Sequence, residues 1–196
     1  MQWSPTDAHQ LATIDADGQL SLLIHHPGTT AIDERALARD PSLRAVCWDG
    51  SGDYLWCGHV DGNLRRVCLD GSAPVVVAIE APGRDADAEL TRPFRLANNF
   101  LLVVFERPGD GFEPPYIGAV DVTNVAVGGA PLAVQECGQV LYPLGCEVDG
   151  EPARRRLHCV SIPSWRMAVV CSSDSDAVVS VGSRRPPPEQ RWQVIM

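Results

Sequence analysis

Residues Cys47–Val67 read CWDGSGDYLWCGHVDGNLRRV and contain two tryptophans, a Cys-Gly-His triplet and three pairings of aspartate with glycine. The stretch has two possible interpretations: a site that holds phosphate, metal or a nucleophile, or a set of tight turns between strands. Asp-Gly and Ser-Gly are what tight turns require, since glycine supplies a positive φ and aspartate bonds back to the backbone. The rest of the chain decides between the two.

The same order of features occurs once before, in residues 1–25. Trp3 precedes a turn, a short apolar strand and an Asp-Gly at Asp17, just as Trp48 precedes a turn, a strand and an Asp-Gly at Asp61. The two tryptophans are 45 residues apart and the two aspartates 44, which is the repeat length of WD-type propeller blades. The repeat therefore favours turns within successive blades.

Runs of strand length continue along the whole chain, and almost nothing has a helical period. One short stretch, Ala31–Arg39, allows either an edge strand or a helical turn. Fourteen strands are predicted, at Leu11–Asp15, Leu20–Ile24, Ala45–Trp48, Tyr54–His59, Leu64–Leu69, Pro74–Ile79, Phe94–Ala97, Phe100–Glu106, Tyr116–Val122, Leu132–Glu136, Arg156–Ile162, Met167–Cys171, Ala177–Val181 and Trp192–Ile195.

Polar connections rich in glycine or proline divide these strands into groups of up to four. The connections are Pro27–Asp40, Pro82–Arg92, Gly138–Ala153 and Ser183–Arg191. The prediction is a single all-β domain over residues 1–196, a β-propeller of the WD-repeat type with four blades at roughly 1–40, 41–92, 93–150 and 151–196. Because Met1–Trp3 looks like the tail of an innermost strand and the final RWQVIM like an outer strand, we expect these blades to be consecutive members of a larger ring.

Composition limits the classes of partner. Of 196 residues, 25 are acidic and 16 basic, so the net charge is -9, which disfavours direct binding to nucleic acid or an anionic membrane and suits basic partners. The sequence shows neither a signal peptide nor an apolar run as long as a membrane helix. Seven cysteines, an odd number placed singly, indicate reduced thiols in the cytosol or nucleus.

No set of residues fits a known catalytic or metal-binding pattern. The glycines after Asp49 lack the lysine of a phosphate loop, and the Asp-Gly after Asp15 falls at the wrong spacing for a calcium loop. Cys57 and His59 share one face of a strand, which permits a weak zinc pair but is explained as well by core packing. His158 and Cys159 are adjacent, so on a strand they point to opposite faces. The prediction is a protein that is not an enzyme and has no cofactor or metal.

The acidic connection GRDADAEL provides the candidate binding residues. Asp85, Asp87 and Glu89 are placed there to meet a basic partner, the alternative being a plain solvated loop. Two arginine-rich stretches, 154–156 and 184–188, are explained by solvated loops and by prolines that end strands.

The order of elements resembles one family in particular, the N-terminal seven-bladed propeller of the CAN-type cytoplasmic-filament nucleoporins, over its later blades. The pieces that carry the resemblance are MQWSPTDAHQLATIDADGQLSLL, AVCWDGSGDYLWCGHVDGNLRRV, the acidic loop running into RPFRL, NNFLLVVFERPGDG followed by YIGAVDV, and RRLHCVSIPSWRMAVVCSSDSDAVVSVGSR with the trailing RW. These segments span nearly the whole chain.

The resemblance implies a non-enzymatic scaffold at the cytoplasmic face of the nuclear pore complex. Its partners would be other nucleoporins and the DEAD-box helicase that acts in mRNA export, held by acidic propeller loops, and Asp85, Asp87 and Glu89 fall in the loop that resembles one of these. Two other functions stay open: a WD-repeat adaptor in another cytosolic or nuclear complex, since one fold hosts many functions, and an enzyme that uses cysteine or a metal.

Overall fold

The computed structural model consists of strands and their connections, and it describes residues 1–81, 87–97, 100–106, 116–126, 128–139, 157–162, 167–172, 178–183 and 192–195. These residues form seventeen strands in four sheets. Within the same residues, no helix is long and apolar enough to cross a membrane.

The first two sheets each contain four antiparallel strands in chain order. The first sheet is made of β1 (Gln2–Trp3), β2 (Gln10–Ile14), β3 (Gln19–His25) and β4 (Ile32–Arg39). The second is made of β5 (Leu43–Trp48), β6 (Tyr54–His59), β7 (Leu64–Cys68) and β8 (Val75–Val77).

The third sheet has five strands, because a segment from the preceding connection joins it. It is made of β10 (Glu89–Ala97), β11 (Phe100–Glu106), β12 (Tyr116–Asp121) and β13 (Leu132–Gln139), and β9 (Ile79–Glu80) pairs parallel with β13 at its edge. The fourth sheet is made of β14 (Leu157–Ile162), β15 (Met167–Ser172), β16 (Val178–Ser183) and β17 (Trp192–Ile195).

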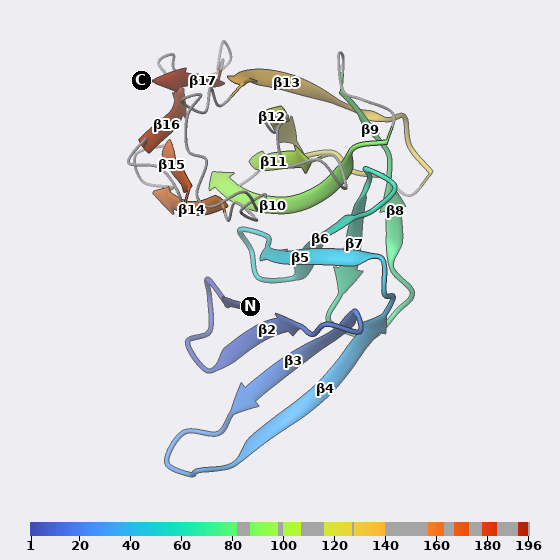
Figure 1. Ribbon diagram of the computed structural model, residues 1–196. Helices are drawn as coiled ribbons and strands as arrows, with labels where there is room; N and C mark the ends of the chain where they lie inside the picture. The colour runs from blue at the N-terminus through green and yellow to red at the C-terminus, as the bar shows by residue number, and fades with distance from the viewer. Residues whose placement is uncertain are drawn as a thin grey trace, which may run out of the picture.

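The four sheets follow one another in a curved row (Figure 1). Each sheet begins with an edge strand, and these edge strands touch in succession: β1 contacts β5, β5 contacts β10, and β10 contacts β14. Because the strands that touch are the first of each sheet, the sheets converge at that edge. The third and fourth sheets also touch through β13 and β17.

All fourteen predicted strands have a counterpart in the structure. Of the three other strands, β1 corresponds to the inner-strand tail expected at Met1–Trp3, β4 lies in Ala31–Arg39, and β9 was not predicted as a separate strand. β4 settles the ambiguity of Ala31–Arg39, because its residues pair along β3 as the outer strand of the first sheet. Its run of charges reads as a helix face in the sequence, but most of β4 is exposed, as the outer edge of a sheet allows.

The assignment of residues 89–92 to a connection is wrong. β10 begins at Glu89, which pairs with Glu106, and the adjacent Leu90 is fully buried. Proline is normally confined to the edge or start of a strand. In the structure β10 is the edge strand on that side of its sheet, so the missing N–H of Pro93 is tolerated inside it.

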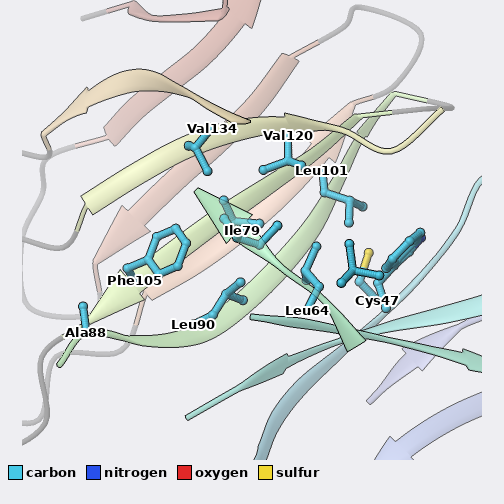
Figure 2. Close-up of a cluster of buried hydrophobic side chains, with 12 residues drawn as sticks. Cys47, Leu64, Ile79, Ala88, Leu90, Leu101, Phe105, Val120 and Val134 are labelled. Atoms are coloured by element: carbon cyan, nitrogen blue, oxygen red, sulfur yellow. The ribbon is translucent and has the colours of Figure 1, made fainter. Parts of the chain in front are cut away.

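Two apolar cores hold the first three sheets together. The core between the first and second sheets includes Ala12, Leu22 and Trp48. Figure 2 shows the core between the second and third sheets, where Cys47 and Leu64 meet the larger group from β9 to β13. The sheets are therefore bound face to face by buried apolar surface, the dominant stabilising term in folding.

The internal repeat has a structural counterpart in cross-strand register. In the second sheet Trp48, Leu55 and Val67 lie side by side on β5, β6 and β7, and all are at most 1% exposed. The indole Nε1 of Trp48 donates to the main-chain oxygen of Gln2 at 2.9 Å, and the main-chain N–H of Trp48 donates to the Gln2 side chain at 2.7 Å. This row is covered by the first sheet.

The equivalent row of the first sheet has a different environment. Trp3, Leu11 and Leu23 lie side by side on β1, β2 and β3 in the same register. Trp3 is 60% exposed, and both leucines are half-buried. The same pattern of residues therefore forms a core between sheets in one repeat and an apolar surface in the other.

Candidate interaction surface

The stretch Asp49–Gly52 forms a turn, as the repeat predicts. The Asp49 carboxylate accepts hydrogen bonds from the main-chain N–H groups of Ser51 at 3.0 Å and Tyr54 at 2.9 Å. Gly52 has a φ of 83°, a conformation that favours glycine. The aspartates and glycines in this part of the sequence therefore shape the backbone.

A pocket of about 530 Å³ opens beside this turn, between the second and third sheets. It is lined by Asp49, Gly50, Ser51, Tyr54, Trp56, Arg66, Val122, Thr123 and Val125. Trp56 and Arg66 lie opposite each other on β6 and β7, and Tyr54 precedes Trp56 by two residues. The second sheet thus supplies two aromatic rings and one guanidinium to the pocket.

Two side-chain hydrogen-bond donors beside this pocket have no acceptor among the described residues. Arg66 donates from Nη1 to the Val125 main-chain oxygen at 3.2 Å, and its guanidinium carbon lies 5.1 Å from the centre of the Tyr54 ring. Trp56 Nε1 and Arg66 Nε are buried and have no hydrogen-bond partner among the described residues. A buried donor without a partner is costly. Because these two nitrogens have almost no exposed surface, a group in the pocket would accept from them only after the side chains around them shift.

His59, the last residue of β6, contacts two aspartates, and one of them, Asp40, lies in the connection before β5. Its Nε2 lies 3.3 Å from an Asp40 carboxylate oxygen, and its Nδ1 lies 2.9 Å from Asp61 Oδ1. Asp61 also accepts from Arg65 Nη2 at 2.7 Å. Partial burial opposes ionisation of Asp61, but hydrogen bonds from Arg65 and the Asn63 N–H, with the charges of Arg65 and His59, outweigh it and lower the Asp61 pKa from 3.8 to about 2.

Cys57, which shares a strand face with His59, is fully buried. Burial raises the pKa of the Cys57 thiol far above its ordinary value, and the neighbouring Cys47 adds to this. A thiol that stays protonated is a poor nucleophile and a poor metal ligand. In the part of the chain that the structure describes, no three His, Cys, Asp or Glu side chains gather closely enough to hold a metal ion.

The three predicted acidic binding residues are placed differently from one another. Asp85 lies outside the described residues, and Asp87 is exposed. Glu89 pairs with Arg44 through two contacts, Nε to Oε2 at 2.8 Å and Nη2 to Oε1 at 3.3 Å, and its side chain is only 19% exposed. Glu89 therefore contributes to the packing of β10 against β5, where its charge is balanced.

Among the comparisons with known proteins, only that with solved structures identifies the fold. No family model matches the chain, and no curated protein matches it either. Solved structures do match, among them the beta-propeller domain of Cps50 (Swd1) from Myceliophteria thermophila, with 15% identity and a TM-score of 0.59, and Hsv2 from Kluyvelomyces marxianus, with 12% identity and a TM-score of 0.55. The chain folds as a WD-repeat-like β-propeller. Each of the four sheets corresponds to one blade.

This propeller spans just over half the length of these two solved structures. The alignments cover 99% and 96% of this chain, but 56% of the Swd1 chain and 55% of the Hsv2 chain. At such low identities the likeness concerns the fold, so the residues that bind partners have to be found in this propeller itself.

The sequence analysis overlooked Tyr54, Trp56 and Arg66, which line the pocket between the second and third blades. Their signal was present, since Tyr54 and Trp56 alternate along one strand and two consecutive arginines follow on the next. The pairing of Arg44 with Glu89 left no such signal, because the two residues are 45 positions apart.

Proposed function

We propose that this propeller is a non-enzymatic scaffold that binds a partner protein through the pocket between its second and third blades. The observation that carries the proposal is the grouping of Tyr54, Trp56 and Arg66 around that pocket, two of their buried N–H groups being without an acceptor. Tyrosine, tryptophan and arginine are the residue types most enriched in the energetic centres of protein interfaces.

The chemistry of the pocket favours an uncharged acceptor on the partner. Asp49 and Arg66 stand in its wall with opposite charges, and the whole chain has a net charge of -9, so the pocket has no net attraction for a carboxylate. A main-chain or amide carbonyl needs no such attraction, and it would accept from the arginine and indole N–H groups once the side chains around them shift. We therefore expect the pocket to bind an extended peptide segment through its carbonyl oxygens.

The test compares partners captured by the unaltered chain with those captured by Tyr54→Ala and Arg66→Lys. Arg66→Lys keeps the charge but loses the planar donors. Val76→Ala is the matched control, because Val76 is a 55% exposed apolar side chain that does not line this pocket. The proposal requires at least one partner that binds the unaltered chain and Val76→Ala but binds neither Tyr54→Ala nor Arg66→Lys. Identical capture by all four proteins would contradict it.

A narrower proposal comes from the resemblance to the CAN-type nucleoporins: the partner is the DEAD-box helicase of mRNA export, and the site of action is the cytoplasmic face of the nuclear pore. The net charge of -9 and the exposed position of Asp87 support it. Glu89 would first have to break its ion pair with Arg44 before it could pair with a basic residue of the partner. An adaptor role in another complex is an equally good account of the fold.

Direct binding to the helicase at two salt concentrations separates these two accounts. Acidic docking predicts binding that weakens as salt rises and that Asp87→Lys reduces, because charge pairs at an exposed surface are screened. Asp33→Lys is the control, since it makes the same change of charge at an exposed position in the first blade. If the helicase does not bind even at low salt, the narrower proposal is wrong and the general scaffold remains the proposal.

A further inference from the structure

Two histidines face each other across the first blade. His25 is the last residue of β3, and His9 immediately precedes β2. The main-chain N–H of His25 donates to the His9 oxygen at 2.8 Å, so the two residues lie directly opposite one another. Their Nδ1 atoms are 3.4 Å apart, and their ring centres are 5.6 Å apart.

The contact made by Nε2 of His25 indicates which nitrogen of the neutral ring carries the hydrogen. His25 Nε2 lies 3.0 Å from the main-chain oxygen of Thr29, which can only accept a hydrogen bond. Nε2 therefore carries the hydrogen in the neutral ring, and the Nδ1 lone pair of His25 points toward His9. A histidine that donates one N–H to a main-chain oxygen and offers its other nitrogen is arranged as metal-ligating histidines usually are.

The separation of the two Nδ1 atoms is the separation that one metal ion would require. With metal–nitrogen distances of about 2.0–2.1 Å, two ligands at a tetrahedral angle are about 3.3–3.4 Å apart. We propose that His9 and His25 form a two-histidine site for a divalent transition-metal ion of the Zn²⁺, Ni²⁺ or Cu²⁺ class, for which imidazole is a suitable ligand.

The remaining coordination positions would be taken by water, since both histidines lie near the surface: His9 is exposed and His25 half-buried. His26, the next residue, takes no part, because its Nε2 is paired with Asp33 at 2.7 Å. A site with two protein ligands binds less tightly than the four-ligand structural zinc sites, and it leaves positions that an outside ligand could occupy.

The test is calorimetric titration of the untagged chain with Zn²⁺. We expect one ion per chain, with affinity reduced about tenfold or more in His9→Ala and in His25→Ala. His26→Ala is the matched control and should bind as the unaltered chain does. Because His9 and His26 are exposed and His25 lies at the end of a strand, circular dichroism should show that all three variants keep their fold.

A second measurement identifies the ligands. Titration with Co²⁺ should give the weak visible bands of nitrogen and water ligands, without the strong near-ultraviolet absorption of thiolate ligands. The proposal is overturned if Zn²⁺ shows no saturable binding, which would make the contact a plain hydrogen bond between the rings. It is also overturned if His9→Ala and His25→Ala bind as the unaltered chain does, or if the thiolate absorption accompanies binding.

Discussion

Replacing Trp48 by alanine should destabilise this propeller far more than the same change at Trp3, although the two tryptophans occupy equivalent positions in the repeat. Trp48 is 1% exposed and donates to Gln2, so its removal leaves a cavity between two blades and an unmet acceptor. Changes of this kind cost about 3–5 kcal/mol. Trp3 is 60% exposed and leaves no cavity, so its loss should cost about 1 kcal/mol.

Urea denaturation followed by circular dichroism measures both free energies of unfolding. For a chain of this length, the expected loss in Trp48→Ala corresponds to a fall in Tm on the order of 10 °C, and that in Trp3→Ala to a few degrees. Trp48→Phe separates the two contributions, because it keeps most of the apolar volume and removes the indole donor. Its cost should fall between those of the two alanine variants.

Equal losses in Trp48→Ala and Trp3→Ala would refute this reasoning. That result would mean that the first blade buries Trp3 in solution as fully as Trp48, against something other than the blades described. The experiment therefore also measures whether the apolar row on β1, β2 and β3 is exposed in the protein as prepared.

Two further predictions concern the second blade. Gly58→Ala should lower the free energy of unfolding by about 1–3 kcal/mol or more, because the added Cβ would lie 2.2 Å from the Leu90 main-chain oxygen on the neighbouring blade. Gly71→Ala should lower it by only roughly 1 kcal/mol, since Gly71 has a positive φ but nothing within 4 Å of an added Cβ. Equal losses of stability for the two variants in urea denaturation would count against close packing of the blades. Asp61→Asn should make the protein less sensitive to acid. Because the Asp61 pKa is lowered from 3.8 to about 2, the stabilisation by its ionised form is complete above about pH 5 and is lost as the pH falls toward 2. The ionised Asp61 should stabilise the fold by about 1 kcal/mol, after allowance for solvent screening of its 41% exposed side chain. A Tm that falls equally from pH 5 to pH 2 in the unaltered protein and in Asp61→Asn would contradict this prediction.

The sequence predicted the fold because repeated blades repeat their local chemistry. Trp3 and Trp48 are each followed by an Asp-Gly turn, and the register of the strands between them is the same in both blades. β9, two residues long, was missed because a strand so short has no period of its own and exists only through pairing with its neighbours.

The candidate surface was harder to predict, because it depends on contacts between blades. Glu89 reads as part of an acidic loop, but Arg44, on a different blade, neutralises it. The donors of Trp56 and Arg66 lack acceptors only because the surrounding blades bury them, which no local pattern reveals. His9 and His25 are brought together by the pairing of two strands whose ends lie 16 positions apart in the chain.

The placement of β9 has a mechanical consequence. This short segment leaves the second blade, where the Ile79 N–H donates to the Asn63 side chain at 3.1 Å, and then runs parallel to β13 of the third, where the Leu132 N–H donates to the Ala78 oxygen at 2.8 Å. Neither blade can pull away without breaking hydrogen bonds at this strap and exposing buried Ile79. Under an applied force the second and third blades should therefore give way in one step, whereas the first blade, which lacks such a strap to the second among the described residues, should peel off separately.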